Sequence, residues 1–585
     1  MNRSHTALGF ALLCASCATP APHPAAPEPT PKPNTPQLSA EPPVAGAATP
    51  SPLVVTIVVD QFAAWLASER LPKLPASGGF ARLLREGTYV KELRYAHAIT
   101  DTAPGHAALF TGAPPSVHGV FANQRVDRDS GAIVSITRDP TAKLVTASGV
   151  GSGPSASTRG LLAEPVADRL RATHPDALIV ALSMKDRGAI FGAGRHPTAC
   201  LWFDSKVSDF VSSDAFATGL PGWALGGSNA VRPKHTPSWQ LGDGAWIQAH
   251  TNVPDAAPGE GALGGLTQSF PHAIQGADHP GLAFSVSPYG DEAVVDLAIA
   301  ALGALPFGKQ PGLLALSLSS TDYVGHVYGP DAWEWWDNFR RLDRELARLF
   351  EALDARVGAE GYAVVLSADH GTGVLPETRA LTGARPWCTG SEPDHFERPC
   401  DDGGRIHLDR LVPGLEAAAK RSVGPGRWVL TAANPYVYLT RAALALPDSQ
   451  RTRLTHALTA ELERHPGIEA VIARSTEPCP PPEDESLAAL VCRSFSPDAG
   501  ELYVVSRPGW YLETGYVPGF GVNHGSHRLH DRSVPLLARA PGRIAASRLV
   551  APPQSFAMFA QTVSRLLEID APKQAYAAPS ALELR

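Results

Sequence analysis

Six acidic and histidine side chains stand at positions where they could bind metal ions. Two of them form an Asp-x-x-x-His spacing and two form an Asp-His pair. The other two stand alone, one directly after an apolar run and one within Val-Asn-His-Gly-Ser. They are Asp60, Asp322, His326, Asp369, His370 and His524. Carboxylate and neutral imidazole groups suit Zn²⁺, and two zinc ions with three protein ligands each need six such groups. The set therefore predicts a centre of two zinc ions with open positions for a substrate.

Each part of this set also has an ordinary structural explanation. Asp60 could be a turn or cap residue at the end of a strand, and Asp322 with His326 could be a surface pair. Asp-His-Gly, at Asp369, occurs by chance in many loops. The metal interpretation depends on all these parts occurring in one chain, most of them at strand ends.

The stretch Thr100–Gly112 adds a candidate nucleophile. Thr102 is followed by Ala-Pro-Gly and then by an apolar run, which places it at or just before the N-terminus of a predicted helix. Backbone N–H groups and the positive end of the helix dipole favour an anion there. No His or Lys is adjacent in sequence to act as a base, so a metal ion is the expected activator of the hydroxyl. The alternative is that Thr102 only caps the helix.

Four apolar runs are predicted to position these side chains. They are residues 53–59, 177–183, 312–318 and 362–366, and each runs into Asp, His, Lys or Arg. Such strands, alternating with helical stretches, predict an α/β fold with a doubly wound, mostly parallel sheet flanked by helices. Ligands of open α/β sheets bind outside the carboxyl ends of the strands, so one shared crevice is expected there.

Two helices are predicted between these strands. Apolar residues recur every three or four positions from Trp335 to Val357, which predicts a long helix with one buried stripe. We interpret the Asp and Arg residues on its other face as solvated surface. A second helical run extends from Glu292 to Leu302 and precedes the strand that ends near Asp322.

Composition places the chain among globular proteins. It has 585 residues, of which 44% are hydrophobic and 18% charged, and its formal net charge is -7. No basic run stands out, so nothing indicates a protein that binds nucleic acid. An anionic substrate would have to be attracted by local charges in the site.

The N-terminus has the pattern of an export signal. Arg3 and His5 precede a short apolar run, and Ala15-Ser16 before Cys17 resembles the cleavage site of a bacterial lipoprotein signal. We predict a signal over residues 1–17, with Cys17 lipidated, and a Pro- and Ala-rich linker over 18–52. Ordinary signal cleavage, or an N-terminus without any targeting role, are the alternatives. The apolar run is too short to span a bilayer.

The remaining chain, residues 53–575, is predicted to be the catalytic domain. The stretch around 195–285 shows little periodicity, and the stretch around 376–520 contains several short strand-like runs. Both are predicted to be insertions that form a cap or rim beside the crevice. Cys388 with Cys400 and Cys479 with Cys492 could form local disulfides in an exported protein. That assignment leaves Cys200 as a buried thiol.

Several motifs together resemble the alkaline phosphatase superfamily, and more closely the phosphate-irrepressible alkaline phosphatases that use a threonine nucleophile. The resemblance covers nearly everything from about residue 53 to 540. The motifs are Asp-Thr102-Ala-Pro-Gly-His, Asn123 after His118-Gly, Lys185-Asp-Arg187, Ser-Pro-Tyr-Gly-Asp-Glu292, Thr-Asp322-Tyr-Val-Gly-His326, Ser-Ala-Asp369-His370-Gly and Asn-His524-Gly-Ser.

The resemblance implies a role for each ligand and for the nucleophile. Asp322, His326 and His524 would hold one zinc. The other zinc would be held by the remaining three candidates and by the alkoxide of Thr102, namely Asp60, Asp369, His370 and Thr102. The two ions would lie roughly 4 Å apart. Thr102 would attack phosphorus to form a phosphothreonine, and water would then hydrolyse that intermediate.

Three further residues would set the substrate class. A phosphate monoester has one more charged oxygen than a diester, which Lys185 and Arg187 can neutralise and to which Asn123 can donate. The alternative is that Lys185 and Arg187 form surface ion pairs. Sulfatases share the fold, but this chain lacks the Cys or Ser with the Pro and Arg pattern that they need.

Four other histidines are not assigned to the metals. We interpret His106 and His118 as structural residues beside the nucleophile helix. His527 and His530 lie close to His524 in the sequence, and His524 is chosen because Asn-His-Gly-Ser carries the match.

The predicted function is zinc-dependent hydrolysis of phosphate monoesters by an exported protein, an alkaline phosphatase of the periplasm or one anchored to the outer membrane through Cys17. We expect a monomer. One alternative is a phosphodiesterase or nucleotide pyrophosphatase of the same superfamily, and another is a non-catalytic, tethered phosphate-binding protein.

Overall fold

Strand β1 (Leu53–Val59) lies in the middle of the main sheet. All seven of its residues are buried, as expected for a β-branched run covered on both faces. It pairs in parallel with β12 (Gly312–Leu318) and with β13 (Ala363–Ser367). On the far side of β12 follow β7 (Leu178–Ser183) and β8 (Ala199–Asp204), both parallel. The four predicted strands are therefore confirmed as neighbours in one parallel block.

The structure is a computed structural model that describes residues 52–225, 232–378, 381, 404–513, 521–578 and 582. The predicted signal and nearly all of the predicted linker lie outside these residues. The described residues belong to one compact unit, Pro50–Arg585. None of their helices combines the length and the apolar character needed to cross a membrane.

Further strands, most of them in antiparallel pairs, extend the block on both sides and give a mixed sheet of twelve strands. Beyond β13 lie β20 (Ser533–Arg539) and β2 (Thr88–Arg94), and β2 pairs with β21 (Arg548–Val550) and β22 (Gln554–Ser555). Beyond β8 lie β9 (Asp209–Ser213), β5 (Arg138–Thr146) and β6 (Gly149–Ala156). Strands β8 and β9 fall within the expected insertion around 195–285. That part of the segment instead extends the sheet, because the apolar residues of β8 are buried beside β7.

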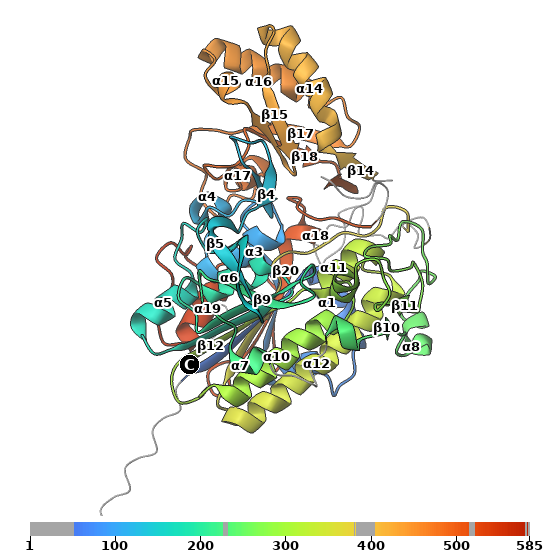
Figure 1. Ribbon diagram of the computed structural model, residues 1–585, viewed down its shortest axis with the longest axis vertical. Helices are drawn as coiled ribbons and strands as arrows, with labels where there is room; N and C mark the ends of the chain where they lie inside the picture. Colours follow the sequence, from blue (N-terminus) through green and yellow to red (C-terminus); the bar gives the residue numbers. More distant parts are fainter. Residues whose placement is uncertain are drawn as a thin grey trace, which may run out of the picture. The chain divides into compact units, whose positions relative to one another are not determined.

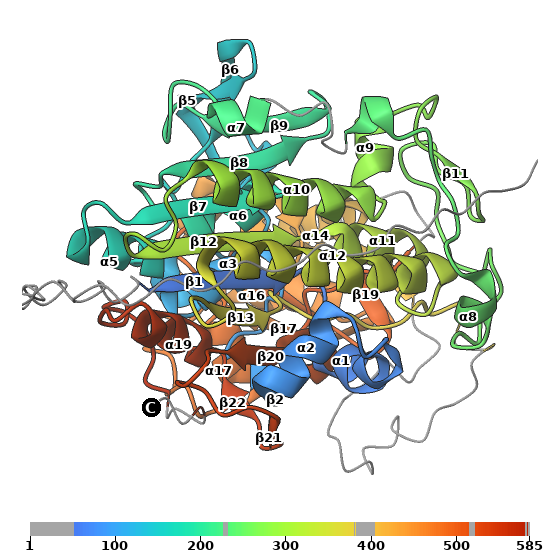
Figure 2. The same ribbon diagram turned by 90° about the horizontal axis from the view of Figure 1, so that it is seen from below.

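Helices cover both faces of the sheet. One group contains α10 (Tyr289–Ala304), α11 (Ser320–Tyr328), α12 (Trp333–Val357) and α2 (Gly79–Glu86). The other contains α3 (Thr102–Thr111), α5 (Val166–Thr173), α6 (Asp186–Ala193) and α19 (Met558–Leu566). Helices α10 and α6 both contact β7 and β12, and Figures 1 and 2 show α10 and α12 together on one side of the sheet. This is the predicted doubly wound arrangement.

Helix α12 confirms the predicted apolar stripe, but two of its acidic residues are not solvated. Asp337 is buried and accepts hydrogen bonds from Trp239 Nε1 at 2.7 Å and from Arg341 Nε at 2.7 Å. Asp343 is buried and accepts from the backbone N–H of Phe80 at 2.9 Å. The prediction of a solvated face was wrong here, because neighbouring segments dock onto these two carboxylates.

The later expected insertion contains a second, smaller sheet. Its order is β15 (Val429–Ala433), β16 (Tyr436–Leu439), β18 (Leu502–Ser506) and β17 (Ile468–Ala473). Helices α14 (Leu408–Val423) and α16 (Asp448–Leu462) pack with it around a core of their own, drawn in orange in Figure 1. Strand β14 (Gly404–His407) pairs in parallel with β19 (Trp510–Glu513).

The cysteines follow the predictions where the structure describes them. Cys479 and Cys492 form a disulfide, and Cys200 is a free, buried thiol. Cys388 and Cys400 lie outside the described residues.

The shorter elements connect these layers. They are α1 (Ala64–Arg70), η1 (Leu71–Lys73), α4 (Pro115–His118), β3 (Gln124–Val126), β4 (Ile133–Ser135), α7 (Gly222–Leu225), η2 (Pro233–His235), β10 (Ser238–Trp239), α8 (Gly244–Gln248), β11 (His272–Ala273), α9 (Pro280–Ser285), α15 (Arg441–Leu444), α17 (Leu487–Cys492) and α18 (Leu529–Arg532).

Candidate active site

Polar side chains from four parallel strands meet at the carboxyl edge of the sheet. Asp60 directly follows β1, and Asp369 comes two residues after β13. Asp322 lies in the first turn of α11, which begins two residues after β12, and Lys185 caps α6 just beyond β7. All four are buried. The strands run in the same direction, so their ends bring together residues that are far apart in the sequence.

Two groups of side chains have their ligand atoms close enough to share an ion. One is Asp60, Asp369 and His370, the same three protein side chains that were predicted for one zinc. The other is Asp322, His370 and His524, in which His370 stands where His326 was predicted. His326 is adjacent to this second group, because its Nε2 lies 3.2 Å from Asp322 Oδ1 and 3.2 Å from His524 Nε2.

The three histidines of this region are oriented in the same way. Nδ1 of His326 lies 2.8 Å from the carbonyl oxygen of Val522, and Nδ1 of His524 lies 2.8 Å from that of Thr100. Nδ1 of His370 lies 2.9 Å from the carbonyl oxygen of Gly371. A carbonyl oxygen can only accept, so each Nδ1 carries a proton and donates it. Each Nε2 is then the atom that faces the carboxylates, an orientation typical of metal-binding histidines.

Lys185 lies between the carboxylates and Thr102. Its Nζ donates to Asp60 Oδ2 at 2.7 Å and to Asp322 Oδ2, and it lies 3.3 Å from Thr102 Oγ1. Burial lowers the pKa of Lys185, but Asp322 and Asp60 outweigh burial and hold the pKa above its ordinary value. The ammonium group therefore stays charged beside the candidate nucleophile.

Thr102 is the first residue of α3, as predicted, and Asp101 is the N-cap residue. The backbone N–H of Ala103 donates to Asn123 Oδ1 at 2.8 Å. The backbone N–H of Asn123 donates to Asp101 Oδ2 at 3.3 Å. Because Asn123 uses its oxygen on the helix start, its Nδ2 hydrogens are left for another acceptor.

Arg187 follows in the first turn of α6. Its Nη1 lies 3.6 Å from Asp186 Oδ1, and Asp186 Oδ2 accepts from Thr137 Oγ1 at 2.5 Å. Within the described residues, Nε of Arg187 is buried without a hydrogen-bond partner. A guanidinium group with an N–H donor that is not used within the protein is suited to bind an anion.

The buried atoms of the first group fit a divalent cation. Among the described residues, Asp60 Oδ1, Asp369 Oδ2 and His370 Nε2 are buried without hydrogen-bond partners. These are the oxygen and nitrogen donors that zinc takes. Asp60 and Asp322 both contact the ammonium group of Lys185, and Asp369 lies close to Asp60. Further positive charge would stabilise these three carboxylates.

The pKa values of the ligand residues reflect this crowding of like charges. Burial and the carboxylate of Asp60 raise the pKa of Asp369. Burial lowers the pKa of His370, but Asp369 and Asp60 outweigh burial and raise it to about 10. Burial and the neighbouring His370 lower the pKa of His524 to about 4.

Two residues next to the ligands were missed by sequence reasoning. Gln61 donates from its Nε2 to Asp322 Oδ1 at 3.0 Å and from its backbone N–H to Asp369 Oδ1 at 3.2 Å, so it joins both groups. Its φ of 66° is uncommon for a residue other than glycine. Its place directly after Asp60 was the available signal.

His106 is the second missed residue. It was predicted to pack beside the nucleophile helix, but it is a residue of α3 itself. Its Nδ1 lies 3.1 Å from Asp369 Oδ2 and 2.9 Å from the carbonyl oxygen of Thr102. His106 therefore connects the nucleophile helix to a candidate ligand. The spacing of four residues from Thr102 on one helix was the available signal.

The other histidines lie apart from both groups. His118 is buried, its Nδ1 accepts from the backbone N–H of Val120 at 3.1 Å, and burial lowers its pKa to about 3. Burial lowers the pKa of His527 to about 3 as well, and His530 lies beside Asp531 at 3.5 Å. Of His524, His527 and His530, only His524 belongs to a candidate metal group among the described residues.

The chain is similar over most of its length to known proteins of one family. Residues 54–527 match the family described as type I phosphodiesterase / nucleotide pyrophosphatase. The chain is 30% identical to alkaline phosphatase PafA of Elizabethkingia meningoseptica, over 91% of this chain and 94% of the relative. It is 29% identical to alkaline phosphatase PhoV of Synechococcus elongatus, over 83% of this chain and 84% of the relative. A crystal structure of wild-type PafA superimposes with a TM-score of 0.75 at 28% identity, covering 92% of this chain and 100% of that chain.

Proposed function

The chain belongs to the type I phosphodiesterase / nucleotide pyrophosphatase family of the alkaline phosphatase superfamily, and from this premise we propose that it hydrolyses phosphate monoesters with Thr102 as nucleophile and two zinc ions as cofactors. The curated relatives named alkaline phosphatases support hydrolysis of phosphate esters. The finer assignment rests on one observation, the contact of Lys185 Nζ with Thr102 Oγ1 on one side and with two candidate ligands on the other.

We assign the two metal positions from the residues that the fold brings together. Asp60, Asp369 and His370 would hold one ion, and Asp322, His326 and His524 would hold the other. When bound, the pair would lower the pKa of a coordinated hydroxyl and stabilise the negative charge that develops on oxygen during phosphoryl transfer.

The chemical steps on the protein's own atoms are as follows. Thr102 Oγ1 loses its proton and forms a bond to phosphorus, while the bond from phosphorus to the ester oxygen breaks and the alcohol leaves with a proton. Water then attacks the phosphothreonine, which releases inorganic phosphate and restores the hydroxyl. The start of α3 supports the phosphoryl group, because helix N-termini favour anions.

Charge at the site favours a monoester over a diester. The transferred phosphoryl group of a monoester carries an additional charged oxygen, and Lys185 and Arg187 are the cations placed to meet it. The Nδ2 hydrogens of Asn123 are a further donor. A diester carries an alkyl or nucleoside group on that oxygen, so it offers Lys185 and Arg187 one charge fewer to bind.

Steady-state turnover of p-nitrophenyl phosphate and bis-p-nitrophenyl phosphate by the zinc-loaded full chain tests this proposal. We expect a strong preference for the monoester that is lost in Thr102→Ala. A preference for the diester would instead assign the phosphodiesterase activity after which the family is described. Full activity in Thr102→Ala would refute the assignment of Thr102 as the nucleophile.

Turnover and phosphate binding, measured on the same two proteins, test the non-catalytic alternative. A tethered phosphate-binding protein would turn over neither ester but would bind inorganic phosphate, and it would do so with Thr102→Ala as well as with the native residue. Calorimetric titration of both proteins with phosphate separates this outcome from loss of folding.

We also propose that residues 1–17 direct export and that Cys17 becomes lipidated, with a periplasmic or outer-membrane location. Expression of the full chain with Cys17→Ser should release a membrane-associated protein into the soluble periplasmic fraction. An unchanged distribution would contradict the lipid anchor.

A further inference from the structure

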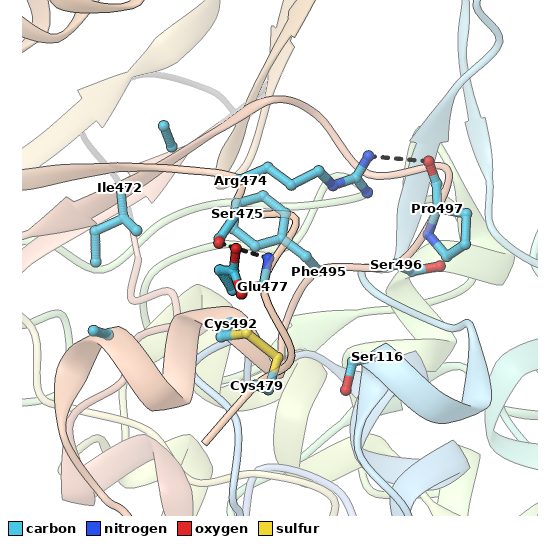
Figure 3. Close-up of a pocket in the computed structure, with 12 residues that line it drawn as sticks. Ser116, Ile472, Arg474, Ser475, Glu477, Cys479, Cys492, Phe495, Ser496 and Pro497 are labelled. Atoms are coloured by element: carbon cyan, nitrogen blue, oxygen red, sulfur yellow. Dashed lines mark hydrogen bonds between the residues drawn. A yellow bond between two sulfur atoms is a disulfide. The ribbon is translucent and has the colours of Figure 1, made fainter.

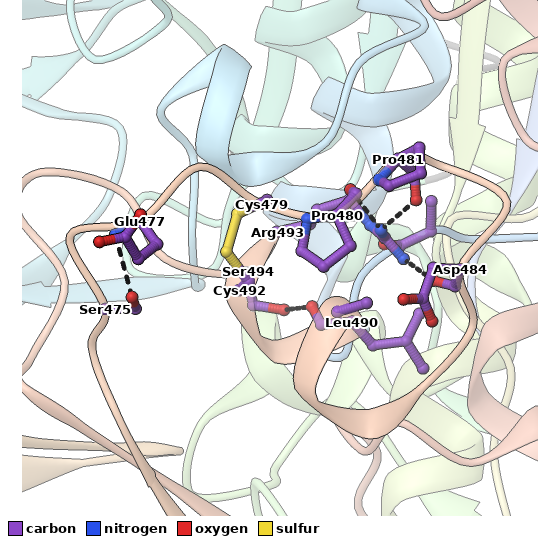
Figure 4. Close-up of a disulfide and its surroundings, with 12 residues drawn as sticks. Ser475, Glu477, Cys479, Pro480, Pro481, Asp484, Leu490, Cys492, Arg493 and Ser494 are labelled. Carbon is purple, nitrogen blue, oxygen red and sulfur yellow. Dashed lines mark hydrogen bonds between the residues drawn. A yellow bond between two sulfur atoms is a disulfide. The ribbon is translucent and has the colours of Figure 1, made fainter.

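A loop closed by the disulfide Cys479–Cys492 ends one residue before Arg493. The guanidinium of Arg493 donates to carbonyl oxygens of the same loop, at 3.0 Å to Pro480, 2.8 Å to Pro481 and 2.5 Å to Asp484. Figure 4 shows these contacts converging on the side chain beside the disulfide. Arg493 is buried and is the C-cap residue of α17. Its several carbonyl acceptors therefore fix the loop to the C-terminal end of this helix.

Arg493 and Ser494, at the C-terminal end of α17, also bind the backbone of residues 96–99, which lead to Thr102. Ser494 Oγ accepts from the backbone N–H groups of Ala98 at 2.8 Å and of Ile99 at 3.2 Å, and donates to the carbonyl oxygen of Leu490 at 2.9 Å. Arg493 Nε donates to the carbonyl oxygen of Ala96 at 2.5 Å. Ser494, Ala98 and Ile99 are fully buried, so water cannot replace the hydroxyl as an acceptor. The N–H of Ala98 also donates to the carbonyl oxygen of Leu490 at 3.2 Å, so Ile99 depends more on Ser494 than Ala98 does.

The segment continues directly into the site. The carbonyl oxygen of Thr100 accepts from His524 Nδ1 at 2.8 Å, and Thr100 Oγ1 donates to the carbonyl oxygen of Ser526 at 2.9 Å. Asp101 is the N-cap residue of α3, and its carbonyl oxygen accepts from the N–H of Gly105 at 2.9 Å. A shift of Ala98 and Ile99 therefore reaches both the first residue of α3 and the orientation of a candidate ligand.

Helix α17, which ends at Cys492 of the disulfide, packs on one side into the core and borders a cavity on another. A cavity of about 330 Å³ lies beside the disulfide and is lined by Ala488, Cys492 and Phe495 among others. Figure 3 shows the disulfide and Phe495 at this cavity. Leu490 and Val491 of α17 belong to the hydrophobic core on the other side, so apolar packing holds this helix together with polar contacts. One of these is the hydrogen bond from Tyr436 Oη to the carbonyl oxygen of Ser494 at 2.7 Å.

We propose that Ser494 is a positioning residue for Thr102: its hydroxyl, two residues beyond the disulfide-closed loop, fixes the backbone ahead of α3 and thereby the direction of the nucleophile. The proposal rests on the proposed function. It assigns a catalytic consequence to a residue of the inserted segment that touches neither the substrate nor the metal ligands.

Kinetics of Ser494→Ala, with the zinc-loaded full chain, test the proposal. We expect kcat to fall by about 10- to 100-fold with KM nearly unchanged, the range for a small misplacement of a reacting group. Both p-nitrophenyl phosphate and its diester should lose the same factor, because both need the nucleophile. Ser475→Ala is the matched control, since Ser475 Oγ accepts from Glu477 N on an exposed part of the same segment. It should leave kcat unchanged.

A second variant keeps the test decisive if Ser494→Ala does not fold. Tyr436→Phe removes one donor to the Ser494 carbonyl and leaves the hydroxyl of Ser494 in place. We expect a smaller loss of kcat with the same ratio of monoester to diester turnover.

Several outcomes would overturn the proposal. Native kcat in folded Ser494→Ala would do so. A loss of kcat that is fully explained by a smaller folded or zinc-loaded fraction, measured by thermal unfolding and metal analysis, would also do so. If Ser494→Ala does not fold, native kcat in Tyr436→Phe has the same meaning. Thr102→Ala distinguishes failure of the proposed function from failure of this inference. If Thr102→Ala stays active, Thr102 is not the nucleophile and the proposed function fails. If Thr102→Ala is inactive and Ser494→Ala has native kcat, only the role of Ser494 is refuted.

Discussion

A methyl group at Gly105 would separate the nucleophile helix from a candidate metal ligand. A Cβ at this position would lie 2.0 Å from the carbonyl oxygen of Asp369 and 2.7 Å from its carbonyl carbon. Both contacts are with backbone, so no side chain can rotate away. To reach the ordinary contact of 3.4 Å, α3 and the Asp369 backbone must move apart by about 1.4 Å. Thr102 is carried by the same helix, three residues earlier.

This displacement should affect activity more than folding. A shift of about 1 Å at the reacting group lowers kcat by roughly 100-fold, which corresponds to about 2.7 kcal/mol of activation free energy. Overpacking should lower the free energy of unfolding by about 1–3 kcal/mol. The better helix propensity of Ala should return up to about 1 kcal/mol of this.

The assay compares Gly105→Ala with Gly303→Ala in turnover of p-nitrophenyl phosphate, zinc content and thermal unfolding. Gly303 is exposed in α10, and its added Cβ would meet no other part of the described chain within 4 Å apart from its own helix backbone. The control should keep native kcat and gain up to about 1 kcal/mol of stability. A folded, zinc-loaded Gly105→Ala whose kcat stays within about threefold of native would refute the reasoning that couples α3 to Asp369.

Three further predictions concern the metal, the substrate and pH. Removal of zinc by a chelator should lower the melting temperature, and zinc at about 1,000 times its dissociation constant should restore about 4 kcal/mol; an unchanged melting curve would contradict a resident metal. Arg187→Ala should reduce turnover of the monoester more than that of the diester, and equal loss on both substrates would show that Arg187 does not recognise the extra charged oxygen. The pKa of buried His118 falls to about 3, below its value in the unfolded chain, so it adds stability above about pH 6.5 that is lost as pH falls toward 3. His118→Asn, whose Oδ1 can accept from Val120 N in place of Nδ1, should flatten the decline in melting temperature between pH 6.5 and 4; an identical decline would exclude this residue as its source.

Local patterns in the sequence were enough to find the parallel block and the start of α3. The run Leu53–Val59 is apolar throughout, and a strand covered on both faces needs such a run. Thr102 before Ala-Pro-Gly has a strong local preference for a helix start, because Pro is favoured in the first turn. The disulfide Cys479–Cys492 was predictable because its residues are close in the sequence.

Other assignments depended on contacts between distant segments. The buried state of Asp337 and Asp343 follows from Trp239 and Phe80, which dock on α12 from elsewhere in the chain. Nothing in the pattern of α12 distinguishes these carboxylates from solvated ones.

The sequence by itself determined which side chains stand at strand ends and which of them can bind metal or attack phosphorus. Only the tertiary structure decided that His370 is shared by both candidate groups, that Lys185 reaches Thr102, and that Gln61 joins the two groups. The reason is physical. Strand and helix periodicity is set by residues a few positions apart, whereas these distances depend on how the register of the sheet brings residues hundreds of positions apart to the same edge.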